Sequence, residues 1–412
     1  MTPNTQCKIC PGSLVPFLSL GKMPAANAFL KREDLKKEEF KFNLEVGFCK
    51  KCKMVQLTEL VPYEKYIVPD NKNKTHYHFY SSTSKFMEIH FAHFAKEIEE
   101  RFLTTDSQVL EIGSNDGIML KAFKKNKVLG IEPSQNVAEV AMGFGIETIT
   151  EFFTENLSKK INLEKGKFKA IIAANVILNI HDLNETVRGV KILLEDRGIF
   201  VFEDPYIIDI LSKNAYDQIY DEHIYYFSLT SLSNLFALHN MEIFDAQKQE
   251  THGGSMRVYT CKKGKYMQTE NVKELLTLEK QKKIDTIEPY LKFARNIKKS
   301  KEKLISLLKN LKGRGKRIVG YAASSKGTVV LNYCNIGPEI LEYIVDSTPE
   351  KQGLFSPGKH IPIVSPEKFR KDNPDYALLG AWNHAQEIMS KEVEFIKMGG
   401  KFVVHIPTAR II

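Results

Sequence analysis

The chain has 412 residues, of which 43% are apolar and 26% are charged, and its formal net charge is +9. It is too long for one hydrophobic core, so we expect two or three domains. Because it lacks a signal-peptide core, an apolar run of roughly 20 residues and enough cysteines for a disulfide framework, we expect a soluble, cytoplasmic protein with no membrane partner.

Residues 1–70 are predicted to form a zinc-binding module. They carry two Cys-x-x-Cys pairs, Cys7 with Cys10 and Cys49 with Cys52. Two cysteines at this spacing reach one ion from a tight turn, so two pairs supply a complete tetrahedral set of thiolates. A closed set leaves no open coordination position, so we expect a structural zinc ion. Unrelated thiols or a redox-active pair are the alternatives, and the long gap between the pairs is the weak point of the zinc interpretation.

Residues 71–265 are predicted to form an α/β core. Apolar and aromatic residues recur at steps of three and four up to about residue 105, which predicts a helix. Short apolar strands then alternate with helices, and the strands are expected at 109–112, 128–131, 170–174 and 199–202. This alternation predicts a parallel sheet with helices on both faces.

Residues 266–312 are predicted to form a helical linker, and residues 313–412 a second α/β domain. In the linker, lysines alternate with leucine and isoleucine at helical spacing, which is typical of a solvated helix face. Since no helix-turn-helix or RNA-recognition signature accompanies this charge, we expect no nucleic-acid partner. In the last domain, strands are expected at 317–322, 340–345, 376–379 and 402–406.

The turn Gly113-Ser-Asn-Asp-Gly117 follows the first strand of the core. Glycines let the backbone approach a ligand at the carboxyl end of a strand, where open α/β sheets bind. Asp116 would repel a pyrophosphate, which favours S-adenosylmethionine, a ligand with a sulfonium, an ammonium and no phosphate. Roughly 20 residues on, Glu132 ends the second strand, where an acid accepts both ribose hydroxyls. A plain structural turn is the alternative. We assign to this cofactor site Gly113, Asn115, Asp116, Gly117, Glu132, Pro133 and Asn175.

Over nearly its whole length the chain resembles the sugar-nucleotide C-methyltransferases. The motifs that carry the resemblance are the two cysteine pairs, the glycine turn, and the stretches 216–228, 253–258 and 320–328. The resemblance implies a zinc domain, a Rossmann-like methyltransferase core and a second Rossmann-like domain that helps hold the nucleotide. It also implies methyl transfer from S-adenosylmethionine to a carbon of a nucleoside-diphosphate deoxysugar, C-3 next to a 4-keto group. We expect the protein to be a monomer.

The stretch around Glu222 and His223 is the most specific marker of this resemblance. A carbon next to a ketone must lose a proton before it attacks a methyl group, so the site needs a base and donors for the enolate. His223 suits the base because imidazole titrates near neutral pH. Glu222 is expected to orient it or to titrate with it, and Tyr220 to donate to the enolate oxygen. A hydrogen-bonded structural histidine is the alternative.

Two residues depart from the family's pattern. Asn179, which we count with the candidate catalytic residues, stands where the family usually has a histidine. Asparagine cannot exchange protons, although it can hydrogen-bond to a substrate oxygen. Asp221 replaces a second histidine, in the family's usual Tyr-His-Glu-His stretch. These changes leave open whether the acceptor atom is carbon, oxygen or nitrogen.

The candidate substrate residues fall in two places. Tyr77 and Tyr80 lie where the family places aromatic groups beside the donor and substrate, with ordinary core aromatics as the alternative. After the first strand of the last domain, hydroxyls, backbone donors and one cation suit a diphosphate, and an ordinary turn is the alternative. The residues there are Ser324, Lys326 and Thr328, and Asn383 also matches the family. A zinc-ribbon nucleic-acid-binding or scaffold protein with a degenerate fold is a further alternative, which the intact acids of the cofactor turn oppose.

Overall fold

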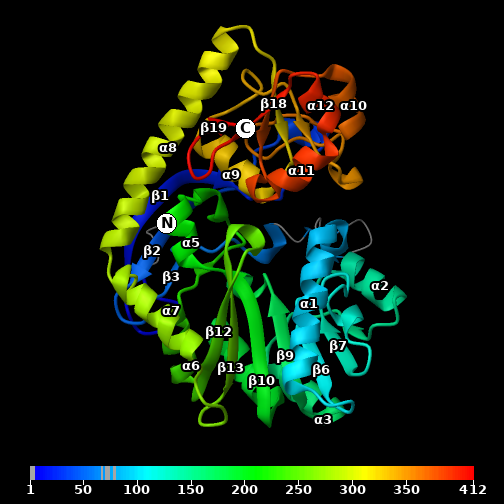
Figure 1. Ribbon diagram of the computed structural model, residues 1–412, viewed down its shortest axis with the longest axis vertical. Helices are drawn as coiled ribbons and strands as arrows, with labels where there is room; N and C mark the ends of the chain where they lie inside the picture. The colour runs from blue at the N-terminus through cyan, green and yellow to red at the C-terminus, as the bar shows by residue number, and fades with distance from the viewer. Residues whose placement is uncertain (1–4, 66–67, 70–74, 78–79) are drawn as a thin grey trace.

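The computed structural model describes residues 5–65, 68–69, 75–77 and 80–412 (Figure 1). This part of the chain forms sheets of four, seven and six strands and a two-stranded hairpin. Each of its helices falls short of the length or the apolarity that crossing a lipid bilayer requires. The predicted boundary after residue 70 lies outside the described residues, and the division into four units stays a prediction.

The four-stranded sheet is antiparallel and comes mainly from the N-terminal segment. Its strands, in order, are β1 (Leu14–Pro24), β2 (Lys41–Cys49), β3 (Val55–Leu57) and β11 (Tyr225–Tyr226). β11 comes from the middle of the chain, and its Tyr225 pairs with Gln56 of β3. This pairing places the residues that follow His223 against the N-terminal sheet. The hairpin consists of β4 (Val68–Pro69) and β5 (Thr75–His76).

The seven-stranded sheet occupies the middle of the chain, in the order β12-β13-β10-β9-β6-β7-β8. The five strands from β10 to β8 are parallel, whereas β13 pairs antiparallel with both β10 and β12. The strands are β6 (Gln108–Ile112), β7 (Lys127–Ile131), β8 (Thr148–Ile149), β9 (Phe168–Ala174), β10 (Leu194–Pro205), β12 (Met241–Gln249) and β13 (Ser255–Lys262). The predicted parallel sheet is confirmed, with an antiparallel hairpin added at one edge.

Helices cover both faces of this sheet, because neighbouring residues of a strand point to opposite sides. Val109 packs in one cluster with Ile98 of α1, and Leu110 packs in another with Val187 of α4. Figure 1 shows α1 lying along the strands. The helices are α1 (Lys85–Phe102), α2 (Gln135–Gly143), α3 (Glu155–Lys165), α4 (Leu183–Leu193), α5 (Ile207–Lys213) and α6 (Leu229–Leu238). Short 3-10 helices include Ser81–Thr83, Ile177–Asn179, Tyr216–Gln218, Thr251–Gly253 and Trp382–His384.

Two helices occupy the lysine-rich stretch, α7 (Glu270–Gln281) and α8 (Glu288–Gly313). Apolar residues three, four or seven positions apart bury one face of α8, while most of its lysines are exposed. The rings of Phe17 and Phe48 lie 5.2 and 5.1 Å from that of Tyr290 on α8. α8 therefore packs on the four-stranded sheet, and it runs along one side of the molecule towards the C-terminal sheet (Figure 1).

The six-stranded sheet has the order β16-β15-β14-β17-β18-β19 and is parallel except for β19. Its strands are β14 (Ile318–Tyr321), β15 (Ile344–Val345), β16 (Ile363–Val364), β17 (Tyr376–Leu379), β18 (Lys401–Val404) and β19 (Arg410–Ile411). Its helices are α9 (Ser325–Tyr333), α10 (Pro366–Asp372), α11 (Ala385–Lys391) and α12 (Val393–Lys397). The predicted fold class, two Rossmann-like α/β units behind an N-terminal cysteine cluster, is confirmed.

The loop 216–223 joins the three sheets. The Trp382 indole N–H, from the C-terminal unit, donates to Asp217 Oδ2 at 2.7 Å. Asp221 Oδ1 accepts from the backbone N–H of Ala26, in the N-terminal segment, at 2.9 Å. The loop with the candidate catalytic residues therefore contacts both neighbouring units.

Candidate active site

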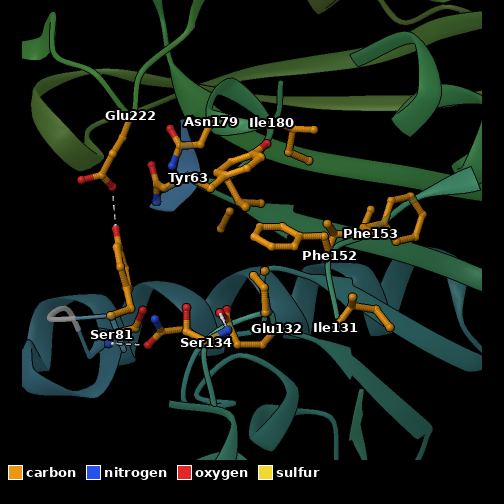
Figure 2. Close-up of a pocket in the computed structure, with 18 of the residues that line it drawn as sticks. Tyr63, Ser81, Ile131, Glu132, Ser134, Phe152, Phe153, Asn179, Ile180 and Glu222 are labelled. Atoms are coloured by element: carbon orange, nitrogen blue, oxygen red, sulfur yellow. Dashed lines mark hydrogen bonds between the residues drawn. The ribbon is translucent and has the colours of Figure 1, made fainter. Parts of the chain in front are cut away.

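A cavity of about 330 Å³ lies at the carboxyl ends of β9, β6 and β7, which are neighbours in the seven-stranded sheet. Open α/β sheets bind ligands at this edge. Figure 2 shows Glu132 and Glu222 on opposite sides of the cavity, so the cofactor acid and a candidate catalytic acid face one space. The predicted site residues that line it are Tyr77, Gly113, Asn115, Glu132, Pro133, Asn175, Asn179 and Glu222.

The turn after β6 requires glycine at both ends. Gly113 has a φ of +69° and Gly117 a φ of +76°, in the left-handed region that favours glycine. A Cβ on Gly113 would lie 2.6 Å from Val176 Cγ2, and a Cβ on Gly117 would lie 2.6 Å from Ile146 Cδ1. Backbone conformation and packing together exclude larger side chains at both positions. Gly113 and Asn115 of this turn line the cavity.

Glu132 follows β7 and is held by two backbone N–H groups. The N–H of Asn115 donates to Oε2 at 3.0 Å, and the N–H of Ser134 donates to Oε1 at 2.8 Å. Burial raises the pKa of Glu132, and these hydrogen bonds oppose the rise by favouring the ionised form. A carboxylate has about four acceptor positions, so acceptor capacity remains for ribose hydroxyls.

Asp116 and Gly117 do not line the cavity. Asp116 is buried, and its Oδ2 accepts from the backbone N–H of Ser82 at 3.0 Å. Asn115 Oδ1 accepts from the N–H of Ser81, also at 3.0 Å. These contacts hold the 3-10 helix before α1 against the glycine turn, so Asp116 contributes by holding this segment and not by lining the cavity.

Asn175 and Asn179 follow β9 at the same edge. Asn175 has a φ of +56°, which places it in the left-handed region. In the part of the chain that the structure describes, the Oδ1 atoms of both residues are buried without a hydrogen-bond partner. Since buried polar atoms are normally paired, these two oxygens are suited to contacting a ligand. Tyr80 differs: its hydroxyl accepts from Asn136 Nδ2 at 2.8 Å, and it does not line the cavity.

Glu222 forms the wall opposite Glu132. Asn27 Nδ2 donates to its Oε1 at 2.5 Å, and the hydroxyl of Tyr77 donates to its Oε2 at 3.1 Å. Burial raises the pKa of Glu222, and both hydrogen bonds oppose the rise. Burial and the charge of Glu222 raise the pKa of the adjacent Asp221 to about 8. Of these two neighbouring carboxyl groups, the two donors favour the negative charge on Glu222 and the proton on Asp221.

His223 is buried and does not line the cavity. Its Nδ1 lies 2.8 Å from the carbonyl oxygen of Gln218, and its Nε2 lies 2.5 Å from the hydroxyl of Tyr220. Because a carbonyl only accepts, Nδ1 carries the proton and Nε2 accepts from Tyr220. Burial, together with the charge of Lys326, holds the pKa of His223 well below its usual range. The ring is therefore neutral, with its lone pair directed at Tyr220.

The candidates at the start of α9 do not line the cavity either. Ser324 caps α9: its Oγ accepts from the N–H of Gly327 at 3.0 Å and donates to the carbonyl of Gly380 at 2.8 Å. The hydroxyl of Thr328 donates to the carbonyl of Ala26 at 3.0 Å. Both hydroxyls have intramolecular partners, and Thr328 connects the C-terminal unit to the N-terminal segment.

Lys326 contacts both Asn383 and His252, and His252 is a residue that we did not predict. Lys326 Nζ lies 3.4 Å from Asn383 Oδ1 and 3.5 Å from the carbonyl of His252, and burial lowers the pKa of Lys326 to about 8. His252 lines the cavity and has a φ of +53°, a strained conformation for a residue with a side chain. Gln218 Nε2 also donates to its carbonyl, at 2.5 Å. The neighbouring glycine pair was the available signal for this turn.

Asn27 is a second residue that we did not predict. It lies 195 positions before Glu222 in the chain, and no local pattern connects the two. Tyr63 and His181 also line the cavity, with their rings stacked at a centroid distance of 3.8 Å. Both Asn27 and Tyr63 belong to the N-terminal segment, so this segment forms part of the site.

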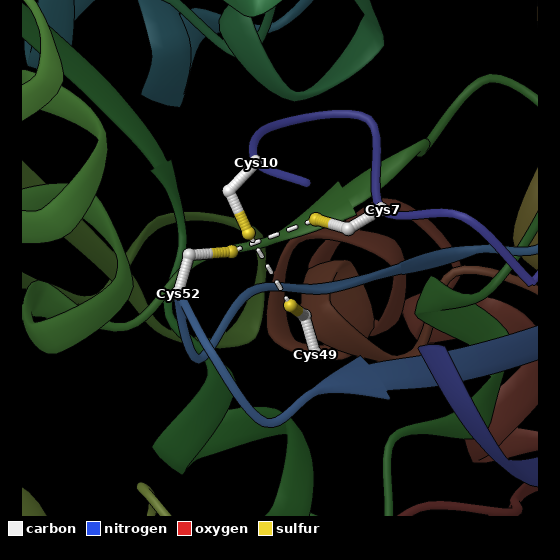
Figure 3. Close-up of side chains that lie close together, drawn as sticks. All are labelled: Cys7, Cys10, Cys49 and Cys52. Atoms are coloured by element: carbon white, nitrogen blue, oxygen red, sulfur yellow. Dashed lines mark hydrogen bonds between the residues drawn. The ribbon is translucent and has the colours of Figure 1, made fainter. Parts of the chain in front are cut away.

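The four predicted zinc ligands come together, as Figure 3 shows. Cys7 and Cys52 sulfurs lie 3.5 Å apart, Cys10 and Cys49 sulfurs lie 3.6 Å apart, and all four lie within 4.8 Å of one another. Tetrahedral zinc–thiolate bonds place sulfurs about 3.8 Å apart, so the cluster fits zinc. All four thiols are buried. Gln56 Nε2 donates to Cys7 Sγ at 3.1 Å and orients that ligand.

Three family models match successive parts of the chain. Residues 7–66 match one described as "Putative zinc binding domain", residues 86–245 match "Methyltransferase domain", and residues 250–407 match "C-methyltransferase C-terminal domain". The chain is also 32% identical over 415 residues to C-methyltransferase NovU of Streptomyces niveus, covering 100% of this chain and 97% of that protein. The resemblance inferred from the motifs is confirmed.

Two solved structures each match less than half of the chain. The YcgJ protein from Bacillus subtilis is 17% identical over 39% of this chain and 73% of its own, with a TM-score of 0.32. The plantazolicin methyltransferase BpumL in complex with SAH is 14% identical over 43% of this chain and 84% of its own, with a TM-score of 0.35. Likenesses this weak define neither the fold nor the ligand.

The full-length match therefore covers the zinc cluster, the glycine turn and the C-terminal sheet. The chain belongs to the C-methyltransferase family, and it is a methyltransferase that uses S-adenosylmethionine and has a structural zinc site.

Proposed function

We propose that the enzyme transfers the methyl group to a carbon next to a carbonyl of a nucleoside-diphosphate deoxysugar, C-3 beside a 4-keto group. The observation that carries this proposal is the buried Glu222 carboxylate, which faces the same cavity as the cofactor acid Glu132. The relative in Streptomyces niveus is named a C-methyltransferase, which supports transfer to carbon. The choice of a keto sugar rests on the resemblance of the motifs.

Transfer to carbon needs a base, because a carbon next to a carbonyl must lose a proton before it attacks. Glu222 is the first candidate, since it lines the cavity and burial raises its pKa, which makes the carboxylate a stronger base. Bound S-adenosylmethionine supplies an electrophilic methyl group. Tyr77, which donates to Glu222, also lines the cavity and would hold the carboxylate towards the acceptor carbon.

His223 remains a predicted base, with Tyr220 as its partner. If the Tyr220 hydroxyl turns towards the enolate oxygen, the unprotonated Nε2 of His223 becomes free to accept the substrate proton. Asn179, whose side-chain oxygen is buried and unpaired among the described residues, would then contact a sugar hydroxyl rather than exchange a proton.

The diphosphate is proposed to bind near Lys326 and Asn383. The hydrogen bonds of Lys326 are long, at 3.4 and 3.5 Å, which leaves its ammonium group able to donate to a phosphate oxygen. His252 lines the cavity, and its carbonyl oxygen lies 3.5 Å from Lys326 Nζ. The sugar would thus extend from the cavity past His252 towards the start of α9.

Mass spectrometry and NMR of reaction products test the proposal. The purified enzyme would be incubated with S-adenosylmethionine and a panel of keto deoxysugars linked to dTDP, UDP, GDP or CDP. We expect one acceptor to gain a methyl group on a carbon. A methyl group on oxygen or nitrogen would contradict the choice of acceptor atom, and no transfer to any keto sugar would contradict the substrate class.

A further inference from the structure

The segment that follows β1 lies against the loop 216–223 and is held on both sides. Ala25 and Ala26, which follow β1, are buried at 2% and 1% exposure. The backbone N–H of Ala26 donates to Asp221 Oδ1 at 2.9 Å, and its carbonyl accepts from the hydroxyl of Thr328 at 3.0 Å. The backbone N–H and C=O of Ala26 are therefore both hydrogen-bonded, the first to the loop 216–223 and the second to α9. These bonds also restrict the position of the next residue, Asn27.

We infer that Asn27 is a positioning residue for the Glu222 carboxylate, an inference that rests on the proposed role of Glu222. Asn27 donates to one carboxylate oxygen and Tyr77 to the other. One hydrogen bond on each oxygen sets the orientation of the carboxylate plane and favours its ionised form. Since the asparagine amide does not titrate, it keeps donating at any working pH. The N-terminal segment thus contributes directly to the chemistry of the core.

Other charged or titratable groups also face Glu222. The adjacent Asp221 shares its buried surroundings, and the charge of Lys351 lowers the pKa of Glu222. Burial, together with the charge of Glu222, raises the pKa values of Tyr77 and Tyr220, so both stay protonated at neutral pH. Lys351 is held by the carbonyl of Ala323 at 2.9 Å. Substitution of Asn27 leaves all four groups in place, so a change in the titration of Glu222 would report on the amide.

The first test follows the titration of Glu222 without any substrate. NMR of the protein with carboxyl-labelled glutamate would be recorded against pH, and the Glu222 signal would be assigned by its absence in Glu222→Gln. We expect the midpoint to rise in Asn27→Leu, which loses the donor, and to rise further in Asn27→Asp, which has nearly the same shape and adds a like charge. Asn43→Leu is the matched control, because Asn43 is an exposed asparagine of the N-terminal segment whose amide donates to Glu59 at 3.3 Å.

The second test measures exchange of the acceptor's α-hydrogen with deuterium in the presence of S-adenosylhomocysteine. We expect Asn27→Leu to exchange about 10- to 100-fold more slowly than wild type, with unchanged affinity for S-adenosylhomocysteine. An unaltered Glu222 midpoint in both Asn27 variants, or equal shifts in the Asn43→Leu control, would overturn the inference. If the wild-type enzyme exchanged the α-hydrogen of none of the keto sugars, the proposed function would be contradicted instead. The order of the Glu222 titration midpoints in the Asn27 variants would still decide the role of Asn27.

Discussion

Substitution of Glu132 by alanine is expected to weaken cofactor binding about 10- to 100-fold without unfolding the protein. The carboxylate is 6% exposed and receives hydrogen bonds from the backbone N–H groups of Asn115 and Ser134, so its orientation is set before any ligand arrives. A hydrogen bond to a charged group contributes about 1.5–3 kcal/mol, and each 1.4 kcal/mol corresponds to about tenfold in affinity. The loss of one such hydrogen bond to the ribose therefore corresponds to the expected loss of about 10- to 100-fold in affinity.

Isothermal titration calorimetry with S-adenosylhomocysteine measures this loss. Glu147→Ala is the control, because Glu147 is a surface residue paired with Lys165 at 2.6 Å, and its removal should leave affinity unchanged. Burial raises the pKa of Glu132, so wild-type affinity should fall as the pH is lowered through that value, whereas Glu132→Gln should lack this dependence. If Glu132→Ala binds the ligand as tightly as wild type does, Glu132 does not hold the ribose.

Three further predictions concern the metal, the base and the buried lysine. Metal analysis should find one zinc ion per chain. Cys49→Ser should lower both the zinc content and the melting temperature, because the binding energy of the metal is also folding energy. Removal of zinc that leaves the melting temperature unchanged would contradict this prediction. Glu222→Gln should bind both substrates but lose about two to four orders of magnitude in turnover, together with α-hydrogen exchange. Exchange that survives in this variant but disappears in His223→Ala would identify His223 as the base. The pKa of Lys326 is about 8 in the folded protein, against an ordinary value of 10.5. Between these two pH values the lysine is protonated mainly in the unfolded chain, so the free energy of unfolding should rise with pH. In urea unfolding, Lys326→Met should lack this part of the rise.

Features with local signals could be predicted from the sequence. Gly113 and Gly117 were recognisable because a tight turn after a strand needs glycine, and the cysteine pairs because two residues at fixed spacing share a turn. Lys326 and Thr328 were correctly placed after a strand, but the sequence did not indicate that the Thr328 hydroxyl would contact Ala26.

The missed features depend on contacts between distant parts of the chain. Asn27 became part of the site only because β1 ends beside the loop 216–223. His252 was missed because the adjacent glycine pair marks a turn but does not show that the histidine before it also adopts a positive φ. The antiparallel strands β12 and β13 were not predicted, since they pair with each other directly and do not continue the alternation of strands and helices.

The pairing of β11 with β3 affects how the protein emerges from the ribosome. Tyr225 is the partner of Gln56, so the edge of β3 stays open until the chain has been synthesised well beyond Tyr226. Translation adds about 5–20 residues per second, which leaves this edge unpaired for many seconds. An open strand edge is a template for pairing with other chains. A fragment that ends before Tyr225 would keep the edge exposed permanently, so we expect it to aggregate even with zinc bound, whereas a fragment that includes β11 can close its own sheet.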